Sequence, residues 1–413
     1  MKPVTKGERI KLLDALRGFA VFGMFMINIR VFSGYAYIYD ETPENLLLTK
    51  WDKVFNQIHI VFFEGKFYTL FALLFGIGFA IQIVRASSDN RSFIKHYSRR
   101  LFFLLLIGIV HLWGIWFGDI LVMYALCGYL LLLFRNVSNN GLIWTAFIVL
   151  LIPGVYSLYI QLTDGGFTNN LHDWFSNKWK VMGLPIASDE NDTFSFDDMA
   201  EIIRHESWIM VMRFNAIGPA LRLYITAHDV RIVKILGMFI LGLWIGRNIL
   251  FRRIHENNTF LKKTAITGFI IGLPINILFS IDHDTGMEDM FFIIRGTLDT
   301  FGHISLTSAY AATFALLYRT GLRRFIDNNF NAVGRTALSN YIFQSFLGIT
   351  LFYSVGFGMG EYFGATMLTV AVFAIFGFQI LVSKLWLNIF RFGPLEWIWR
   401  VLTYGKYIEN KPK

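Results

Sequence analysis

A histidine and an aspartate lie eight positions apart in the apolar stretch HLWGIWFGDILVMYA, as His111 and Asp119. A histidine next to a carboxylate can act as a general base, because the carboxylate fixes which ring nitrogen carries the proton. The structural alternative is that Asp119 caps the following helix while His111 hydrogen-bonds to a neighbouring helix. The sequence predicts a polar site at this hairpin and leaves both interpretations open.

A second apolar stretch carries Arg295, Asp299 and His303 at intervals of four residues. Residues at this spacing share one face of a helix. Ionisable side chains are costly in hydrocarbon, so each one marks a candidate functional position. We expect this face either to line a cavity, where it would contact substrate, or to form an internal ladder of ion pairs.

Two other stretches contain candidate substrate-binding groups. Glu64 and Lys66 are two positions apart and would not face each other on a continuous helix, so we expect a break at Gly65 that places both at a cavity wall. The stretch VGRTALSNYIFQS carries Asn340 and Gln344, whose side chains can hydrogen-bond to a substrate along one helix.

Arginines near two helix starts are candidates for anion binding. Arg335 opens the helix of VGRTALSNYIFQS, where it can bind a phosphate or a lipid headgroup. Arg17 follows Asp14 in LLDALRG, and this pair can equally be a structural ion pair. Asn28 lies about three turns further along roughly the same face and needs a polar partner inside the protein.

The composition excludes a soluble globular protein and a disordered one. Of the 413 residues, 55% are hydrophobic and 16% are charged, 43 are Phe, and the mean hydropathy is +0.49. Globular domains have about 45–50% apolar and about 25% charged residues. The single cysteine, Cys127, permits no intrachain disulfide and no cysteine metal cluster, and we expect neither a metal site nor a tightly bound cofactor.

The hydropathy pattern predicts an all-α, polytopic transmembrane bundle. A hydrocarbon core of about 30 Å requires about 20 apolar residues per helix. Ten stretches meet this criterion, namely 12–31, 54–84, 101–117, 120–134, 141–162, 231–249, 264–281, 291–318, 336–356 and 365–386.

The charges predict the orientation of this bundle. If the N-terminus is cytoplasmic, the inner connections hold 24 Lys and Arg against 6 Asp and Glu, while the outer connections hold 7 against 19. Excess Lys and Arg marks the cytoplasmic side, so both termini are expected inside. The formal net charge of +9 is then a cytoplasmic surface facing anionic lipid, and nucleic acid is not an expected partner.

A long polar insertion divides the chain into three regions. Residues 1–162 form an N-terminal half with five helices, 163–229 form an extracytoplasmic loop, and 230–413 form a C-terminal half with five helices and a cytoplasmic tail. The segment SWIMVMRFNAIGPALRLYI within the loop carries two arginines and is expected to be an interfacial or re-entrant helix, because an eleventh span would invert every later loop.

Five blocks of the chain resemble a known family. They are LLDALRGFAVFGMFMINI, KFYTLFALLFGIGFA, RRLFFLLLIGIVHLWGIWFGDILVMYALCG, VGRTALSNYIFQS and FRFGPLEWIWRVLTYG. In this order they are similar to the signature blocks of the YeiB-like (DUF418) family of bacterial membrane proteins. That family resembles, more distantly, a transmembrane acyltransferase superfamily. The resemblance implies acyl transfer from cytoplasmic acyl-CoA to an acceptor reached from the outer side.

The chain departs from the O-acyltransferase branch of that superfamily at one position. That branch pairs a first-helix arginine with a histidine eleven residues later, and here Arg17 matches while Asn28 stands in place of the histidine. Asparagine cannot act as a base at neutral pH. The base must then come from another helix, and His111 is the natural candidate.

The leading hypothesis is therefore a multi-pass acyltransferase of the bacterial cytoplasmic membrane. His111 would be the base, Asp119 its orienting partner and Asn28 a donor to the oxyanion or acceptor. Arg17 and Arg335 would hold the phosphates of acyl-CoA, the expected co-substrate. Expected partners also include membrane lipids and a small-molecule or glycan acceptor, with a homodimer left open. The rival hypothesis is a transporter or flippase for a small anionic or amphipathic solute.

Overall fold

The computed structural model describes residues 10–37, 49–85, 90–186, 193–204, 207–252, 256–285, 288–360 and 362–411. The described residues form helices and no strand, as predicted. The helices of the N-terminal half are α1 (Lys11–Phe32), α2 (Asp52–Ile58), α3 (Lys66–Arg85), α4 (Asn90–Gly114), α5 (Leu121–Leu131) and α6 (Asn139–Leu162). The insertion contains α7 (Gly166–Val181), α8 (Asp198–Arg204) and α9 (Trp208–His228).

The C-terminal half contains the remaining helices of the described chain. They are α10 (Arg231–Arg252), α11 (Asn258–Thr285), α12 (Glu288–Leu317), α13 (Arg323–Ile326), α14 (Ala332–Arg335), α15 (Ala337–Phe352), α16 (Ala365–Ile389) and α17 (Pro394–Tyr404). Short 3₁₀ turns follow α1 (Tyr35–Tyr37) and α5 (Leu132–Phe134), and π-helical turns precede α3 (His59–Phe63) and α14 (Asp327–Asn331).

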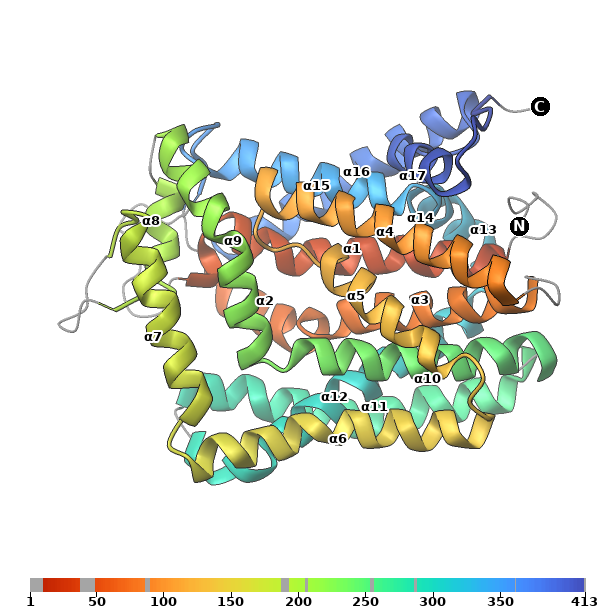
Figure 1. Cartoon of the computed structure of the whole chain (residues 1–413), viewed down its shortest axis with the longest axis horizontal. Coiled ribbons are helices and arrows are strands. Elements are labelled where there is room, and N and C mark those ends of the chain that lie inside the picture. The colour runs from red at the N-terminus through yellow and green to blue at the C-terminus, as the bar shows by residue number, and fades with distance from the viewer. Residues whose placement is uncertain are drawn as a thin grey trace.

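The long helices run side by side; α1 begins and α17 ends at one end of the bundle, while α7, α8 and α9 cover the opposite end (Figure 1). In the described chain, five helical stretches are long and apolar enough to cross a membrane, namely Lys11–Phe32, Asp52–Val84 (which runs from α2 through α3), Asn139–Leu162, Asn258–Ile281 and Ala365–Ile389. They indicate a membrane protein. Each of the ten predicted spans coincides with a helix, but the number of crossings and the side of the termini stay predictions.

Helices α3 and α10 pack closely because glycines line their contact. A Cβ on Gly76 would lie 2.1 Å from the carbonyl oxygen of Phe239, and a Cβ on Gly242 would lie 2.2 Å from that of Leu73. Small residues let the two helix backbones approach each other closely. Such close packing favours helix association in lipid, where the hydrophobic effect contributes little. The contact forms the centre of the bundle.

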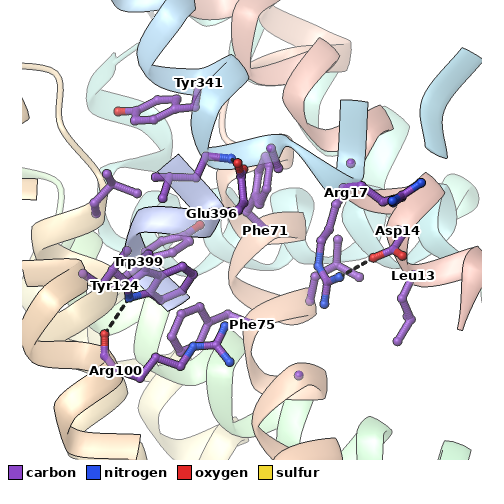
Figure 2. A pocket seen from close by; sticks show the side chains of 18 of the residues that line it. Leu13, Asp14, Arg17, Phe71, Phe75, Arg100, Tyr124, Tyr341, Glu396 and Trp399 are labelled. Atoms are coloured by element: carbon purple, nitrogen blue, oxygen red, sulfur yellow. Dashed lines mark hydrogen bonds and ion pairs between the residues drawn. The ribbon is translucent and has the colours of Figure 1, made fainter. Parts of the chain in front are cut away.

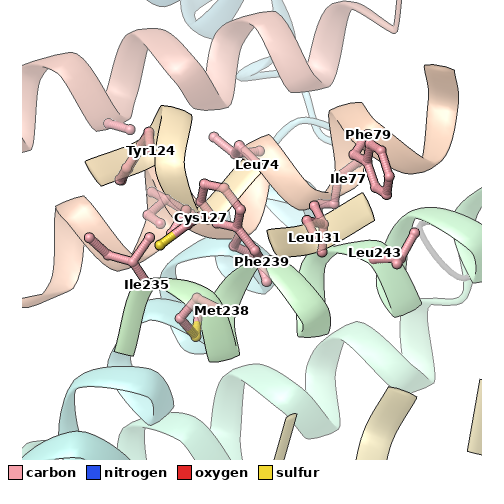
Figure 3. Close-up of a cluster of buried hydrophobic side chains, with 14 of the residues drawn as sticks. Leu74, Ile77, Phe79, Tyr124, Cys127, Leu131, Ile235, Met238, Phe239 and Leu243 are labelled. Carbon is pink, nitrogen blue, oxygen red and sulfur yellow. The ribbon is translucent and has the colours of Figure 1, made fainter. Parts of the chain in front are cut away.

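The largest apolar cluster fills the space between α3, α5 and α10 (Figure 3). Cys127 lies within it, fully buried, next to residues such as Phe239 and Leu131. Its thiol is 3.5 Å from the carbonyl oxygen of Ile232. The cysteine is therefore a core residue of the bundle.

A second apolar cluster joins the insertion to the rest of the protein. Phe175 and Trp179 of α7 and Phe214 of α9 pack with Trp116 and Phe117, which follow α4. Helix α9 runs steeply across the end of the bundle instead of alongside the long helices (Figure 1). Helix α9 thereby covers the turn that carries Asp119, since Gly218 lies against Leu112 and Phe117; its place at a membrane interface stays a prediction.

Candidate active site

The turn between α4 and α5 brings His111 and Asp119 together. Helix α4 ends at Gly114, three residues earlier than predicted, and the chain turns back through residues 115–120. Asp119 Oδ2 lies 2.8 Å from His111 Nδ1, and Asp119 Oδ1 accepts a hydrogen bond of 2.8 Å from the amide of Val122. Asp119 therefore both orients the histidine and caps α5, so the two interpretations of the sequence are compatible.

Ser345 of α15 completes a chain of three side chains. Its Oγ lies 2.9 Å from His111 Nε2, and the side chains of Ser345, His111 and Asp119 are all buried. An ionised carboxylate can only accept hydrogen bonds, so the contact with an ionised Asp119 assigns the proton of a neutral His111 to Nδ1 and leaves Nε2 as an acceptor. The hydroxyl of Ser345 then donates to Nε2, which is its shorter contact, and it also lies 3.4 Å from the carbonyl oxygen of Tyr341.

Aromatic rings enclose this group. The ring of Tyr341 lies 5.1 Å from that of His111, and its hydroxyl donates a hydrogen bond of 3.3 Å to the carbonyl oxygen of Gly118. Trp116 packs on Phe32 at 4.2 Å between ring centroids and contacts the backbone at Gly118, where a Cβ would lie 2.3 Å from the indole. The site is therefore shielded by rings on several sides, which strengthens electrostatic interactions inside it.

A cavity of about 390 Å³ opens beside this group. The volume lies in the range of about 300–1,000 Å³ that is usual for small-molecule sites. One end of the cavity is lined by Tyr341, whose ring contacts His111, and by Ile120 and Leu121, which follow Asp119 in the chain. The walls are apolar or aromatic and consist of Phe71, Phe75, Leu104 and Tyr124. Tyr341 thus separates the cavity from His111, with which its ring packs.

The other end of the cavity is basic (Figure 2). Its lining includes Arg17, Arg100, Arg335 and Arg400, together with His96. This is the end of the bundle where α1 begins and α17 ends. The cavity therefore combines a cationic mouth with an apolar interior, and both arginines predicted from the sequence line it.

Each basic side chain is held by a neighbour. Arg17 Nη1 lies 2.7 Å from Asp14 Oδ1, and Arg335 Nη2 donates a hydrogen bond of 3.1 Å to the carbonyl oxygen of Arg391. Arg100 donates to Gln82 at 2.9 Å and stacks on Trp399, 4.5 Å from the ring centroid. Such anchoring fixes the orientation of the guanidinium groups, which would lower the entropy cost of binding an anion.

A carboxylate also lies at this end. Glu396 of α17 accepts hydrogen bonds from the amides of Leu338 and Ser339, at 2.8 and 3.1 Å, and from the Ser339 hydroxyl at 2.6 Å. It thereby caps the N-terminus of α15, where the helix dipole favours a negative charge. Burial nevertheless raises the pKa of Glu396, and the hydrogen bonds from Ser339 oppose that rise.

Asn28 is half-buried on α1, one turn before Phe32. Among the described residues, no hydrogen bond joins Asn28 to His111, Asp119 or Ser345. Of the predicted catalytic set, the structure therefore brings together His111 and Asp119.

The predicted break at Gly65 is present, with φ of +79°. It lets Lys66 turn inward, where its Nζ donates a hydrogen bond of 2.9 Å to the carbonyl oxygen of Ile60, while the Glu64 side chain remains 55% exposed. The imidazole of His303 packs against Gly65, because a Cβ there would lie 2.4 Å from the ring. Neither Glu64 nor Lys66 lines the cavity described above.

Asp299 is the centre of an ion-pair network. Lys234 Nζ lies 2.7 Å from one carboxylate oxygen of Asp299, and His303 Nε2 lies 3.4 Å from the other. Asp299 and His303 thus interact at i, i+4 as the spacing predicted, whereas the cation bonded to Asp299 comes from α10 and not from Arg295. Two members of this face, Asp299 and His303, thus form the kind of ion-pair contact expected of the ladder, and neither lines the cavity described above.

Asn340 and Gln344 face α16. Asn340 Nδ2 donates to Ser383 Oγ at 3.0 Å, Gln344 Nε2 donates to Gln379 Oε1 at 2.9 Å, and Gln379 Nε2 donates back to the carbonyl oxygen of Asn340 at 3.1 Å. These contacts join two helices inside the bundle. Neither Asn340 nor Gln344 lines the cavity.

Comparison with known proteins gives the family. The profile of the family "Protein of unknown function (DUF418)" matches residues 245–406. An uncharacterized protein of Bacillus subtilis (strain 168), YxaH, is 32% identical over 416 residues that cover 98% of the chain and 96% of that protein. The chain belongs to the DUF418 family.

Two further relatives place this DUF418 protein among YeiB-like proteins. YeiB of Escherichia coli (strain K12) is 28% identical over 96% of each chain, which confirms the predicted resemblance. A 39.9 kDa protein encoded 3′ of an amylase in Bacillus acidopullulyticus is 26% identical over 98% of this chain and 97% of its own length. All three relatives are themselves uncharacterized. No solved structure matches the chain significantly.

Several residues of the site of this DUF418 protein received no role from the sequence alone. The sequence marks Ser345 only as one of several hydrogen-bonding groups on its helix, and it assigns no role to Arg100. It predicts that Trp399 anchors the C-terminal segment at the membrane interface. Arg222 of α9 also lies in electrostatic range of Asp119 and Tyr341. The sequence contains one indication of a role for Arg222: it lies in the apolar segment of the insertion, where an ionisable side chain is energetically costly.

Proposed function

We propose that this DUF418 protein is an acyltransferase of the bacterial cytoplasmic membrane, with both termini inside. The observation that supports this most directly is the adjacency of a basic-mouthed cavity to the buried His111–Asp119 pair. The cavity receives acyl-CoA from the cytoplasm, and the acyl group passes to a hydroxyl or amine acceptor that arrives from the side of α7 to α9.

The dimensions of the site suit an acyl-CoA. In this class of donor the phosphates and the thioester lie at opposite ends of a long, flexible arm. Arg100 and His111 lie on the same helix, eleven residues apart, which corresponds to about 16 Å at 1.5 Å per residue. Phosphates at the arginine end would therefore place a thioester near Tyr341 and His111.

The required chemistry is modest because a thioester is already activated. The protein must position the two reactants, remove a proton from the acceptor and stabilise the oxyanion. His111 has an unprotonated Nε2 when Asp119 accepts from its Nδ1, so it can receive that proton. Arg17, Arg335 and Arg100 supply positive charge for the phosphates, as arginines commonly do.

The test is transfer of a radiolabelled acyl group. The purified full-length protein is incubated with ¹⁴C-acetyl-CoA and with a mixture of bacterial envelope glycans and lipids, and labelled product and free CoA are measured beside a His111→Ala variant. Release of CoA with label in the acceptor fraction, lost in the variant, supports the proposal. Intact acetyl-CoA in every sample contradicts it.

The second candidate function is transport of a small anionic or amphipathic solute. The observation that favours it is the network of Lys234, Asp299 and His303 together with the buried Lys66, because ionisable groups inside a membrane bundle often mark a transport path. A transporter would bind the solute without cleaving it. The ¹⁴C-acetyl-CoA experiment therefore separates the two candidates.

A further inference from the structure

We propose that Ser345 is a nucleophile that carries the acyl group as an ester between donor and acceptor. This inference rests on the proposed acyl transfer and goes beyond it, because the transfer then takes place in two chemical steps through the protein. No resemblance of the sequence points to this serine.

The hydrogen bonds of His111 carry the argument. Its Nε2 is the one ring nitrogen free to accept a proton, and the group bonded to it is Ser345 Oγ at 2.9 Å. The orienting contact, His111 Nδ1 to Asp119 Oδ2, is 2.8 Å. Both lie in the range of about 2.6–3.2 Å expected for a nucleophile, its base and the orienting acid. The proton that His111 is placed to remove is therefore the proton of Ser345.

The surroundings of Ser345 suit an ester intermediate. Ser345 is 1% exposed, and Tyr341, one helical turn earlier, forms the wall towards the donor cavity. A thioester in the cavity would reach Oγ by displacing the Tyr341 ring. Exclusion of bulk water protects a covalent intermediate from hydrolysis.

Trp116 offers a donor for the oxyanion. Its indole N–H is buried and has no hydrogen-bond partner among the described residues, and its ring lies 6.5 Å from that of His111 between centroids. Buried donors are almost always paired, so an orphaned one on a ring that lies beside His111 points to a ligand atom. A developing oxyanion on the acyl carbon would satisfy it.

The first step forms the ester. Ser345 gives its hydroxyl proton to His111 Nε2 while Oγ attacks the carbonyl carbon of the thioester. The carbon–sulfur bond then breaks, and the departing sulfur takes the proton from Nε2, so that free CoA leaves and an acyl-Ser345 ester remains.

The second step forms the product. The acceptor hydroxyl or amine gives its proton to Nε2 and attacks the ester carbonyl, and the bond between the acyl carbon and Oγ breaks. Ser345 Oγ recovers the proton from Nε2. An ester held between the donor cavity and the end of the bundle covered by α9 lets the donor leave on one side before the acceptor arrives from the other.

Two measurements on the purified full-length protein test this inference. The first is mass spectrometry of protein quenched in acid after mixing with acetyl-CoA without acceptor, which should find one acetyl group on the peptide that contains Ser345. The second is labelling by a fluorophosphonate, which reacts with activated serines. Both signals should fall at least about 100-fold in Ser345→Ala and in His111→Ala.

Ser383→Ala is the matched control. Ser383 is also a buried serine that hydrogen-bonds between helices, to Thr336 and Asn340, but its partners include no histidine. It should keep both signals. Because the ester and the label are measured on the unchanged protein, they remain informative even if Ser345→Ala does not fold.

The outcomes separate this inference from the proposed function. If acyl transfer proceeds without an ester, and Ser345→Ala keeps at least a tenth of the transfer rate, Ser345 is not the nucleophile. His111 would then act directly on the acceptor. Fluorophosphonate labelling of Ser345 without consumption of acetyl-CoA supports the nucleophile and contradicts acyl-CoA as the donor. Neither labelling nor consumption contradicts both.

Discussion

His111 Nδ1 and Asp119 Oδ2 lie 2.8 Å apart across the turn that ends α4, and neither side chain is accessible to solvent. The same carboxylate caps α5 through Val122. A residue that stabilises the turn and orients a base couples the local fold to the proposed chemistry. It also means that catalytic and structural effects must be separated experimentally.

The first prediction concerns this pair. His111→Ala should lower acyl transfer by about 10²–10⁴-fold, which is the usual contribution of a general base. Asp119→Asn should lower it less, because the amide keeps an acceptor for Val122 while removing the orienting charge. Rates are measured on both purified variants, with melting temperatures as the folding control. If Asp119 were only a cap, Asp119→Asn would have almost no effect, since Asn is an equally good cap.

The second prediction concerns the cavity mouth. Arg17→Gln and Arg335→Gln should each weaken CoA binding by about 1.5–3 kcal/mol, the usual value for hydrogen bonds to charged groups. Arg324→Gln is the control, because Arg324 is an exposed arginine that does not line the cavity. It should change binding by less than about 1 kcal/mol. Calorimetric titration with CoA gives the three values, and equal losses would indicate only a diffuse basic surface.

The third prediction concerns the ion pair of Lys234 and Asp299. Asp299→Leu leaves the partly buried Lys234 ammonium without its carboxylate and should destabilise the protein by about 3–5 kcal/mol. The double variant Lys234→Met, Asp299→Leu should recover most of that loss, because well-packed apolar residues often replace a buried ion pair without cost.

Thermal unfolding of the two variants in detergent checks this prediction, and acyl transfer is measured on the double variant. If the network is structural, the double variant should keep its transfer activity. A stable double variant without any transfer would instead assign Asp299 a functional role and would weaken the assignment of chemistry to His111.

The fourth prediction concerns orientation in the membrane. Cys127 is the one cysteine of the chain and is buried, so Cys127→Ala provides a background for introduced cysteines. Asn169→Cys, on α7, should react with an impermeant thiol reagent added to intact cells. Asn257→Cys, between α10 and α11, should react only after the membrane is opened. The reverse pattern would place the basic cavity mouth outside and remove access to cytoplasmic acyl-CoA.

The fifth prediction concerns Glu396. Burial raises the pKa of the Glu396 carboxyl in the folded protein above the usual value near 4.5. The carboxyl therefore loses its proton at a lower pH in the unfolded chain than in the folded protein. Ionisation of Glu396 therefore lowers stability as the pH increases from about 4.5 through the raised pKa. Glu396→Gln cannot ionise, and its melting temperature should decline less over that interval. Glu409→Gln, an exposed control nearby in sequence, should behave like the unchanged protein.

Properties of the fold that depend on short stretches of chain were accessible from the sequence. Apolar runs of about twenty residues predict membrane helices because backbone groups in hydrocarbon must be satisfied within the helix. The break at Gly65 followed from a local conflict, since Glu64 and Lys66 cannot face each other on one helix, and the structure resolves it with a left-handed glycine. The pairing of Asp299 with His303 followed in the same way from helical periodicity.

The partners of these side chains across the bundle depended on tertiary structure. Asp299 bonds to Lys234 of α10, and Asn340 faces α16 instead of a cavity, because the rotation of each helix about its axis is set by packing against its neighbours. Helix boundaries also shifted: α4 ends at Gly114, since the following residues turn to cap α5 with Asp119.

Sequence alone therefore determined the class of the protein, its apolar helices and the presence of a polar hairpin at His111 and Asp119, all of which arise from residues near one another in the chain. Only the tertiary structure decided that Ser345 meets His111, because 234 positions separate them and their contact depends on how α4 and α15 pack. The cavity was likewise decided by packing, since its arginines come from α1, α4, α14 and α17 and no local pattern specifies which of the many cationic residues converge.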